Sequence, residues 1–414
     1  MSDFTYLSKC ITQGFTHEEK KKDGIFFTPP SIIKTMTECI QNIPDFHVST
    51  VLEPSCGSCE IIHHLQQTFE NIHITGIEKN TRIYEQIQDK FDENLGVSLL
   101  HRDFLQWDIM NEHKFDLIIG NPPYFVVKKD NIDESFYDLI DGRPNIFVLF
   151  LIHALHKLND NGVLAFVLPH NFTNCVYYSK VRNYIYENFA IIDIIDCLDD
   201  NFLDTKQEIL VFILQKKQDK SDNKRFTLSI NNNTVFNTPS KIHVIQDLYK
   251  GSVSLYSIGA EVSVGTVVWN QCKDILTDDD TQTRLIYSGD IKTNKLDLIH
   301  YKDPSKKNYI LKDGHTGPVL LINRGYGTGN YIFSYCLIDI DTPYLIENHV
   351  IAIQIRGTHS KEELLEQLSK KTVSCKDVTF KVFGLSLTGI NMILSLMITA
   401  ITIKTFISYE KNKL

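Results

Sequence analysis

Several features that would assign the chain to a specialised class are missing from its 414 residues. Positive charge is not in excess, since 42 Lys and Arg face 51 Asp and Glu, and this excludes a basic coat over the whole protein. The nine cysteines are scattered and odd in number, which excludes a dense disulfide framework and predicts reduced thiols. The opening MSDFTYLSKCITQ has no apolar core, so no signal peptide is expected and the chain is assigned to the cytoplasm.

Metal-ligand spacing is also scarce. Cys56 and Cys59 form a C-x-x-C without the second cysteine pair that a zinc site needs, so no metal is expected.

One nearly uncharged run, residues 385–403, has the length of a membrane span. Its Thr, Ser and Asn residues recur at helical spacing and form a polar stripe, which favours a packed helix over a membrane anchor.

Residues 50–215 alternate short apolar strands with amphipathic helices, the pattern of a doubly wound, mostly parallel sheet. Strands are predicted in STVLEPSCG, HITGIEKN, FDLIIGNPPY, GVLAFVLPHNF, AIIDIIDCL and QEILVFILQKK. A helix is predicted over 146–162, with Gly162 as its stop. The polar stretch 216–225 reads as a linker, so the chain divides into 1–215 and 226–414.

The second half is predicted to be a mixed, β-rich domain. Strand patterns occur in VSVGTVVW, TRLIYSGDI, GPVLLINRGYGTG and YLIENHVIAIQI, and SKEELLEQLSKK reads as a helix. Between 291 and 330, seven Lys and Arg face three Asp, so this stretch is locally basic. That excess is equally compatible with an ordinary solvated face and with contacts to phosphates.

Polar side chains follow the strands of the predicted sheet. Glu53 ends the first strand, Glu78 ends the second, and Asp103 follows the next short strand. At the carboxyl ends of such strands, a carboxylate can grip ribose hydroxyls and another can accept a hydrogen bond from an exocyclic amine. Each acid alone could be an ordinary surface or capping residue, but their order favours a nucleoside site.

Asn121, Pro122, Pro123 and Tyr124 follow the buried strand FDLIIG. The prolines fix the backbone, so an Asn oxygen and a proline carbonyl can together accept both hydrogens of a planar amine. The nitrogen lone pair is then free to attack an electrophile. Tyr124 can stack on the base and hold it out of a duplex.

On these residues, segment 24–215 resembles the N6-adenine DNA methyltransferases of restriction–modification systems, particularly the gamma-class, Taq-type enzymes. TPP at 28–30, VLEPSCGSCE and NPPY carry the resemblance. It implies S-adenosylmethionine as methyl donor and a flipped adenine as target, stacked by Tyr124 and Phe202. The cofactor-binding residues implied are Thr28, Glu53, Pro54, Gly57, Glu78, Asp103, Phe104, Asn121 and Phe150. The sequence departs from the family at Cys59, where a second glycine is usual.

The second half is similar, more loosely, to the DNA target-recognition domains of these enzymes. The residues implied to contact DNA are Lys306, Lys307, Arg324 and Tyr326. Double-stranded DNA is the expected partner, a monomer the expected state, and a cognate restriction endonuclease on a separate chain the implied companion. RNA or protein-glutamine methylation, and DNA binding on a catalytically inactive methyltransferase fold, stay open as alternatives. TPP and the extra β-rich domain favour adenine in DNA.

Overall fold

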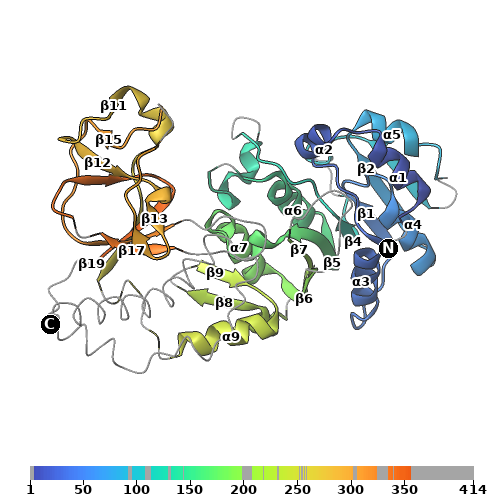
Figure 1. Ribbon diagram of the computed structural model, residues 1–414. Helices are drawn as coiled ribbons and strands as arrows, with labels where there is room; N and C mark the ends of the chain where they lie inside the picture. Colours follow the sequence, from blue (N-terminus) through green and yellow to red (C-terminus); the bar gives the residue numbers. More distant parts are fainter. Residues whose placement is uncertain are drawn as a thin grey trace. The chain divides into compact units, whose positions relative to one another are not determined.

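The computed structural model describes residues 4–91, 96–107, 113–128, 132–142, 144–197, 208–217, 219–230, 233–250, 259–301, 305–323, 334–338 and 340–355, with 252, 255 and 257. The chain forms two compact units, residues 1–245 and 246–414 (Figure 1). No helix within the described ranges is long and apolar enough to cross a membrane, and segment 385–403 lies outside them.

The first unit is built on a seven-stranded sheet in the order β3-β2-β1-β4-β5-β7-β6. Its strands are β1 (Thr50–Glu53), β2 (His73–Glu78), β3 (Val97–His101), β4 (Phe115–Gly120), β5 (Leu158–Pro169), β6 (Ala190–Asp196) and β7 (Ile209–Gln215). Strands β1 to β5 pair in parallel, whereas β7 runs antiparallel between β5 and β6. The doubly wound sheet predicted from the sequence is confirmed, and the order reverses between β1 and β4.

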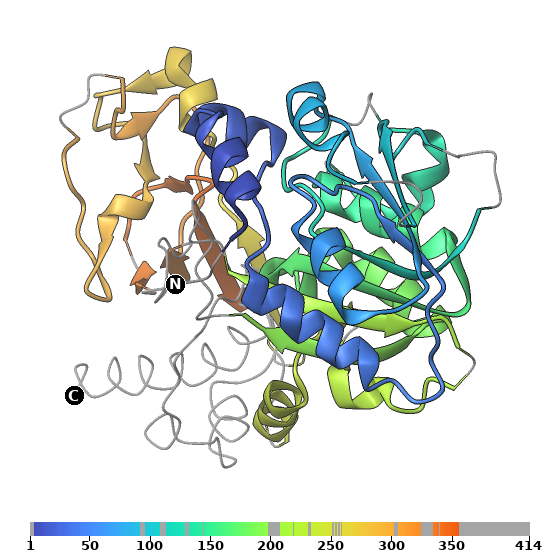
Figure 2. The same ribbon diagram turned by 90° about the vertical axis from the view of Figure 1, so that its right-hand side faces the viewer.

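Helices cover both faces of this sheet (Figure 2). The helices that contribute to its two cores are α1 (Tyr6–Gln13), α3 (Pro30–Gln41), α4 (Glu60–Thr68), α5 (Thr81–Ile87), α6 (Ile146–His156), α7 (Ser179–Asn188) and α8 (Asn223–Phe226), with 3₁₀ turns at Glu134–Leu139, His170–Thr173 and Val176–Tyr178. Helix α2 (His17–Asp23) lies outside these cores, and α9 (Pro239–Tyr249) spans the boundary between the units. Alternate strand residues enter two cores: Leu164 and Phe166 face the core that contains α6, and Val163 and Ala165 face the core that contains α3 and α4.

Helix α6 ends sooner than predicted. It stops at His156, and β5 begins at Leu158, which is fully buried and pairs with Phe115. Asn161 has a φ of +63°, a left-handed conformation that no helix continues through. The helix prediction was therefore wrong over its last six residues, because buried strand pairing replaced the helical pattern.

The division between the units falls at 245/246, beyond the predicted linker. The hairpin of β8 (Thr227–Ile230) and β9 (Asn233–Phe236) stays with the first unit. The fully buried guanidinium of Arg182 on α7 donates to the Thr234 carbonyl, and the Asn223 amide donates to the Phe189 carbonyl. These bonds fasten the segment after residue 216 to the seven-stranded sheet and its helices, so it does not behave as a free linker.

The described part of the second unit is mainly β-structure, with two small sheets and a hairpin, and the helix predicted over 360–371 lies outside it. One sheet has the order β10-β19-β16-β17 and the other β11-β15-β12-β18. Their strands, with the hairpin β13–β14, are β10 (Ala260–Val264), β11 (Leu276–Thr277), β12 (Thr283–Ile286), β13 (Ile291–Lys292), β14 (Lys295–Leu296), β15 (Tyr309–Ile310), β16 (Val319–Asn323), β17 (Tyr335–Ile338), β18 (Tyr344–Ile346) and β19 (Val350–Ile355). The β-rich character predicted for this half is confirmed where it is described.

Candidate functional site

The carboxyl ends of β1, β2 and β4 lie at one edge of the sheet, beside the point where strand order reverses. A cavity of about 510 Å³ opens there, and a much smaller one adjoins it, since both share Gly57 and Asn121 as lining residues. Every residue that the resemblance assigned to the cofactor lines one or both: Pro54, Gly57, Glu78, Asp103, Phe104, Asn121 and Phe150 line the larger cavity, and Thr28, Glu53, Gly57 and Asn121 the smaller.

Glu53 is an unsatisfied acceptor inside the protein. Its side chain is 2% exposed, and its Oε2 atom has no hydrogen-bond partner among the described residues. Burial raises the pKa of the Glu53 carboxyl well above its usual range, and the nearby Cys59 thiol and Glu78 carboxylate act in the same direction. A backbone hydrogen bond from Ile62 opposes the rise in the Glu53 pKa, but Oε2 stays without a donor. A buried carboxylate oxygen without a donor is costly, so this position suits a ligand that brings a positively charged N–H group.

Glu78 is held by backbone amides. Its Oε2 accepts a hydrogen bond from the Gly57 amide at 3.0 Å, and its Oε1 accepts one from the Asn80 amide at 2.6 Å. Burial nevertheless raises the pKa of the Glu78 carboxyl. Gly57 has a φ of +51°, and a Cβ there would lie 2.9 Å from the Phe27 ring. The turn after β1 therefore needs glycine to bring its amide to Glu78.

Asp103 has a neighbour that the sequence did not suggest. Its Oδ2 atom lies 2.7 Å from Nζ of Lys79, while its Oδ1 accepts the Leu105 amide at 3.1 Å. The Phe104 and Phe150 rings lie beside it with centroids 5.1 Å apart and are both buried. Together these side chains give one end of the cavity an apolar wall of two rings tilted by 48° to each other, with a carboxylate beside it.

The NPPY segment is fixed by contacts from three other parts of the chain. Ser55 donates its hydroxyl to the Asn121 carbonyl at 3.2 Å, and Asn121 Nδ2 donates to the Phe26 carbonyl at 3.1 Å. The Tyr124 hydroxyl lies 2.9 Å from Asn121 Oδ1 and 2.8 Å from the Val167 carbonyl. Burial raises the pKa of the Tyr124 phenol well above its usual range, so the group stays a proton donor.

Cys59 occupies a position where the backbone favours glycine. It precedes α4 with a φ of +61°, which explains why a glycine is usual there in the family that the motifs resemble. We expect Cys59→Gly to be more stable than Cys59→Ala by about 1 kcal/mol, because both lose the thiol but only alanine keeps the left-handed strain. Urea unfolding of the two variants would test this, and an alanine variant of equal or greater stability would contradict it.

No group of three or more His, Cys, Asp or Glu within the described ranges is arranged to hold a metal ion. Cys56 and Cys59 are both buried free thiols. Phe202, Arg324 and Tyr326, which the sequence singled out, lie outside the residues that the structure describes. Their assigned roles stay predictions.

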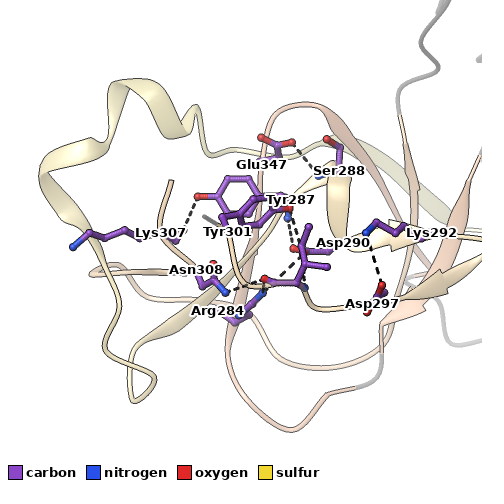
Figure 3. A network of polar contacts seen from close by, with 11 residues as sticks. Arg284, Tyr287, Ser288, Asp290, Lys292, Asp297, Tyr301, Lys307, Asn308 and Glu347 are labelled. Atoms are coloured by element: carbon purple, nitrogen blue, oxygen red, sulfur yellow. Dashed lines mark hydrogen bonds and ion pairs between the residues drawn. The ribbon is translucent and has the colours of Figure 1, made fainter. Parts of the chain in front are cut away.

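In the second unit, Lys307 belongs to a polar network centred on Asp290 (Figure 3). The fully buried Asp290 carboxylate accepts the amides of Tyr287 and Ile299, and the Tyr287 hydroxyl donates to the Lys307 carbonyl at 2.6 Å. Asp290 thereby ties the chain after β12 to the loop before β15.

Lys306 lies over three aromatic rings. Its Nζ atom is 4.1 Å from the Tyr301 centroid, 4.3 Å from Tyr287 and 5.7 Å from Trp269. The neighbouring Lys307 forms an ion pair with Asp278 at 3.2 Å. The rings orient the Lys306 ammonium without neutralising its charge, so this half-buried side chain is set apart from the other lysines of the basic stretch.

The contacts that sequence reasoning missed are those of Asn121 and Tyr124 with backbone carbonyls and that of the Lys79 side chain with Asp103. The carbonyls of Phe26 and Val167 carry no signal in residue identity, although GIFF stands directly before the TPP motif. Lys79 follows Glu78 immediately, and its contact with Asp103 depends on the pairing of β2 with β3.

Comparison with known proteins places the chain in a family. Residues 32–202 match the model of the Eco57I restriction-modification methylase family. The chain is 31% identical to the Type II methyltransferase M.CvrRI of Paramecium bursaria Chlorella virus XZ-6E, over 81% of this chain and 84% of that protein. It is 28% identical to the modification methylase CviBIII of Paramecium bursaria Chlorella virus NC1A, over 86% and 88%.

Among solved structures, the methyltransferase subunit of the Streptococcus thermophilus type I restriction-modification system is similar with a TM-score of 0.41 and 23% identity. That match covers 55% of this chain and 53% of the subunit. The sequence relatives decide the assignment, because the identity to M.CvrRI extends over most of both chains. This protein belongs to the restriction–modification DNA methyltransferases.

Proposed function

We propose that the protein transfers a methyl group from S-adenosylmethionine to the N6 amine of an adenine turned out of duplex DNA. The observation that carries the proposal is the convergence of Glu53, Glu78 and Asn121 on adjoining cavities at the sheet's carboxyl edge. The protein would act as the modification partner of a restriction system, as a monomer in the cytoplasm. The first unit, residues 1–245, would hold the catalytic machinery, and the second unit, residues 246–414, would recognise DNA.

The donor set fits this methyl donor. The unpartnered Glu53 Oε2 is suited to the ammonium of the methionine part, with Thr28 beside it in the smaller cavity. Glu78 accepts hydrogen bonds from the backbone amides of Gly57, Lys79 and Asn80, and the lone pair that remains on its oxygens is suited to the ribose hydroxyls. Asp103 would accept the adenine amine, and Phe104 and Phe150 would contact the ring. When bound, the donor supplies a methyl group already activated on a sulfonium.

The protein's contribution to the reaction is positioning. Asn121 Oδ1 and the Pro122 carbonyl would accept the two hydrogens of the target amine, which directs the nitrogen lone pair toward the methyl group. Tyr124 and Phe202 would hold the base between them. A strong general base is not needed to start the attack, because orientation and hydrogen bonding supply most of the barrier reduction.

DNA would be contacted by the second unit through Lys306, Lys307, Arg324 and Tyr326. Replacing Lys306 with methionine is expected to weaken duplex binding and to reduce the slope of log affinity against log salt by about 1, since one phosphate contact is lost. Fluorescence anisotropy at several salt concentrations would measure both quantities. Lys34→Met removes the same charge from an exposed position on α3 and serves as the control. If Lys306→Met has the wild-type slope of log affinity against log salt, Lys306 does not contact a phosphate.

The function itself is tested by modification-sensitive sequencing of plasmid DNA from cells that express the chain, beside an Asn121→Ala control. N6-methyladenine at one short motif, absent from the control, is the expected result. An unmodified plasmid from folded protein would contradict the proposal. Assays of RNA and of protein glutamine with the same preparations would then separate the alternative substrates from an inactive DNA-binding protein.

A further inference from the structure

The amide of Asn121 is held from two sides by groups of different character. Asn121 Nδ2 donates a hydrogen bond to the Phe26 carbonyl, and the Tyr124 hydroxyl lies 2.9 Å from Asn121 Oδ1. A hydroxyl has one proton, and that of Tyr124 lies within reach of a second acceptor, the Val167 carbonyl. If the proton points to Val167, the Tyr124 oxygen can itself accept a hydrogen bond. Tyr124 alone is therefore compatible with either orientation of the Asn121 amide.

The Phe26 carbonyl removes that ambiguity. A backbone carbonyl only accepts hydrogen bonds, so the atom of Asn121 that faces it must be the NH₂ nitrogen. The amide oxygen then faces the Tyr124 side. Because this oxygen has two lone pairs and Tyr124 uses at most one, the other stays available to a target amine.

The chain around Phe26 is pressed against the NPPY segment. Gly24 has a φ of +69° and ends α2, with its amide donating to the Lys20 carbonyl. A Cβ on Gly24 would lie 2.7 Å from Pro123 Cβ and 3.0 Å from the Tyr124 nitrogen. No side chain fits there without moving one of the two segments.

Residues 4–27, here called the N-terminal arm, are also tied to the far side of the larger cavity. Arg82 on α5 donates to Glu19 at 2.9 Å and to the Gly14 carbonyl, and its guanidinium lies 4.2 Å from the Phe15 ring. Figure 1 shows α1 and α2 beside α5. Gly24, Phe26, Arg82 and Asn121 all line this one cavity, so the arm forms part of its wall.

We infer that the N-terminal arm is a positioning element, whose Phe26 carbonyl selects the catalytic orientation of the Asn121 amide. The same arm lines the cofactor cavity. When the arm is packed against the NPPY segment, the cavity is therefore formed and the Asn121 amide is correctly oriented. The inference rests on the proposed function in one respect, namely that Asn121 Oδ1 accepts a hydrogen bond from the target amine. The positioning group is the backbone carbonyl of Phe26, so the identity of the side chain at position 26 does not reveal this role.

Gly24→Ala tests the inference in the full-length protein. The added Cβ pushes the arm away from Pro123, so the single-turnover rate of methyl transfer to duplex DNA is expected to fall about 10- to 100-fold. The Kd for S-adenosylmethionine, measured by calorimetry, should rise as well, because the displaced arm also lines the cofactor cavity, so the rate is measured with saturating S-adenosylmethionine. Gly142→Ala is the matched control, since Gly142 also has a positive φ, +64°, but its Cβ would meet only Tyr177 at 3.6 Å.

A second readout does not depend on activity. With ¹⁵N-asparagine labelling, the Asn121 side-chain amide, assigned by its loss in Asn121→Ser, should exchange slowly with solvent in wild type and faster in Gly24→Ala. Gly24→Asn tolerates the left-handed backbone and keeps the added Cβ, so it replaces Gly24→Ala if that variant does not fold. A wild-type exchange rate and turnover in the folded Gly24 variants would overturn the inference.

The two proposals fail differently. If wild type modifies no adenine in DNA while the Asn121 amide is protected and loses protection in the Gly24 variants, the proposed function is wrong and the arm's hold on Asn121 stands. If wild type methylates adenine and the Gly24 variants match it in rate and amide exchange, the function stands and the arm is only a wall of the cavity.

Discussion

Replacing Asn121 with alanine is expected to lower the single-turnover rate of methyl transfer by about 100- to 1,000-fold, as loss of one preorganised hydrogen-bonding group from an active site typically does. Alanine removes the acceptor for the target amine together with the bonds to Phe26 and Tyr124. The Kd for S-adenosylmethionine should stay close to wild type, because Glu53 and Glu78 are untouched. Rapid-quench kinetics and calorimetry would measure the two quantities separately.

The control for Asn121→Ala is Asn188→Ala. Asn188 ends α7, is exposed, and donates only to the Tyr184 carbonyl of its own helix. Its variant should keep both rate and affinity. A loss of cofactor affinity in Asn121→Ala as large as its loss of rate would contradict the assigned role, because the residue would then act mainly by shaping the cavity.

Glu53→Gln is expected to produce opposite effects on binding and on stability. It should weaken S-adenosylmethionine binding about 10- to 100-fold, since a hydrogen bond to a charged group is lost. The protein without ligand should become more stable, because glutamine has no charge to desolvate. The unpartnered Oε2 of Glu53 is the reason for both expectations.

The sign of the pH dependence follows from the raised pKa of the Glu53 carboxyl. The folded protein binds this proton more tightly than the unfolded chain, so wild-type stability falls as pH rises from the ordinary glutamate value of 4.5 through the folded pKa. The advantage of Glu53→Gln should therefore grow over that range and vanish below it. Cofactor affinity of wild type should rise over the same range, because the ammonium needs the carboxylate.

Urea unfolding and calorimetry at several pH values would test these expectations, with Glu347→Gln as the control. Glu347 is equally buried but accepts the Ser288 amide at 3.0 Å in the second unit. That variant should leave cofactor binding unchanged. A Glu53→Gln protein that binds S-adenosylmethionine as tightly as wild type at every pH would remove Glu53 from the ammonium site.

The sequence predicted the sheet and the acids at its strand ends because both depend on local patterns. Apolar runs such as FDLIIG predict the strands, and the turn residues after them predict where each strand ends. The sequence therefore predicted that Glu53, Glu78 and Asn121 lie at one site. Their partners could not be predicted. The Phe26 carbonyl is chemically identical to every other backbone carbonyl, and only tertiary packing brings it to Asn121.

The end of α6 and the boundary between the units were missed for a related reason. Residues 157–162 follow a helical pattern, but the pairing of Leu158 with Phe115 makes them a strand. The polar stretch after 216 looks like a linker in isolation. It is fastened by hydrogen bonds from Arg182 to the Thr234 carbonyl and from Asn223 to the Phe189 carbonyl. Such long-range bonds produce no periodic pattern in the sequence from which they could be predicted.

The place of β7 in the sheet has a consequence for synthesis on the ribosome. Strand β7 is made after β6 yet lies between β5 and β6 and pairs with both. Until residues 209–215 have emerged, residues 163–169 of β5 present an unpaired and wholly apolar edge, the kind of surface that recruits other chains. The candidate site thus lies on a sheet that a nascent chain closes only after residue 215 has left the ribosome, when more than half of the protein has been translated.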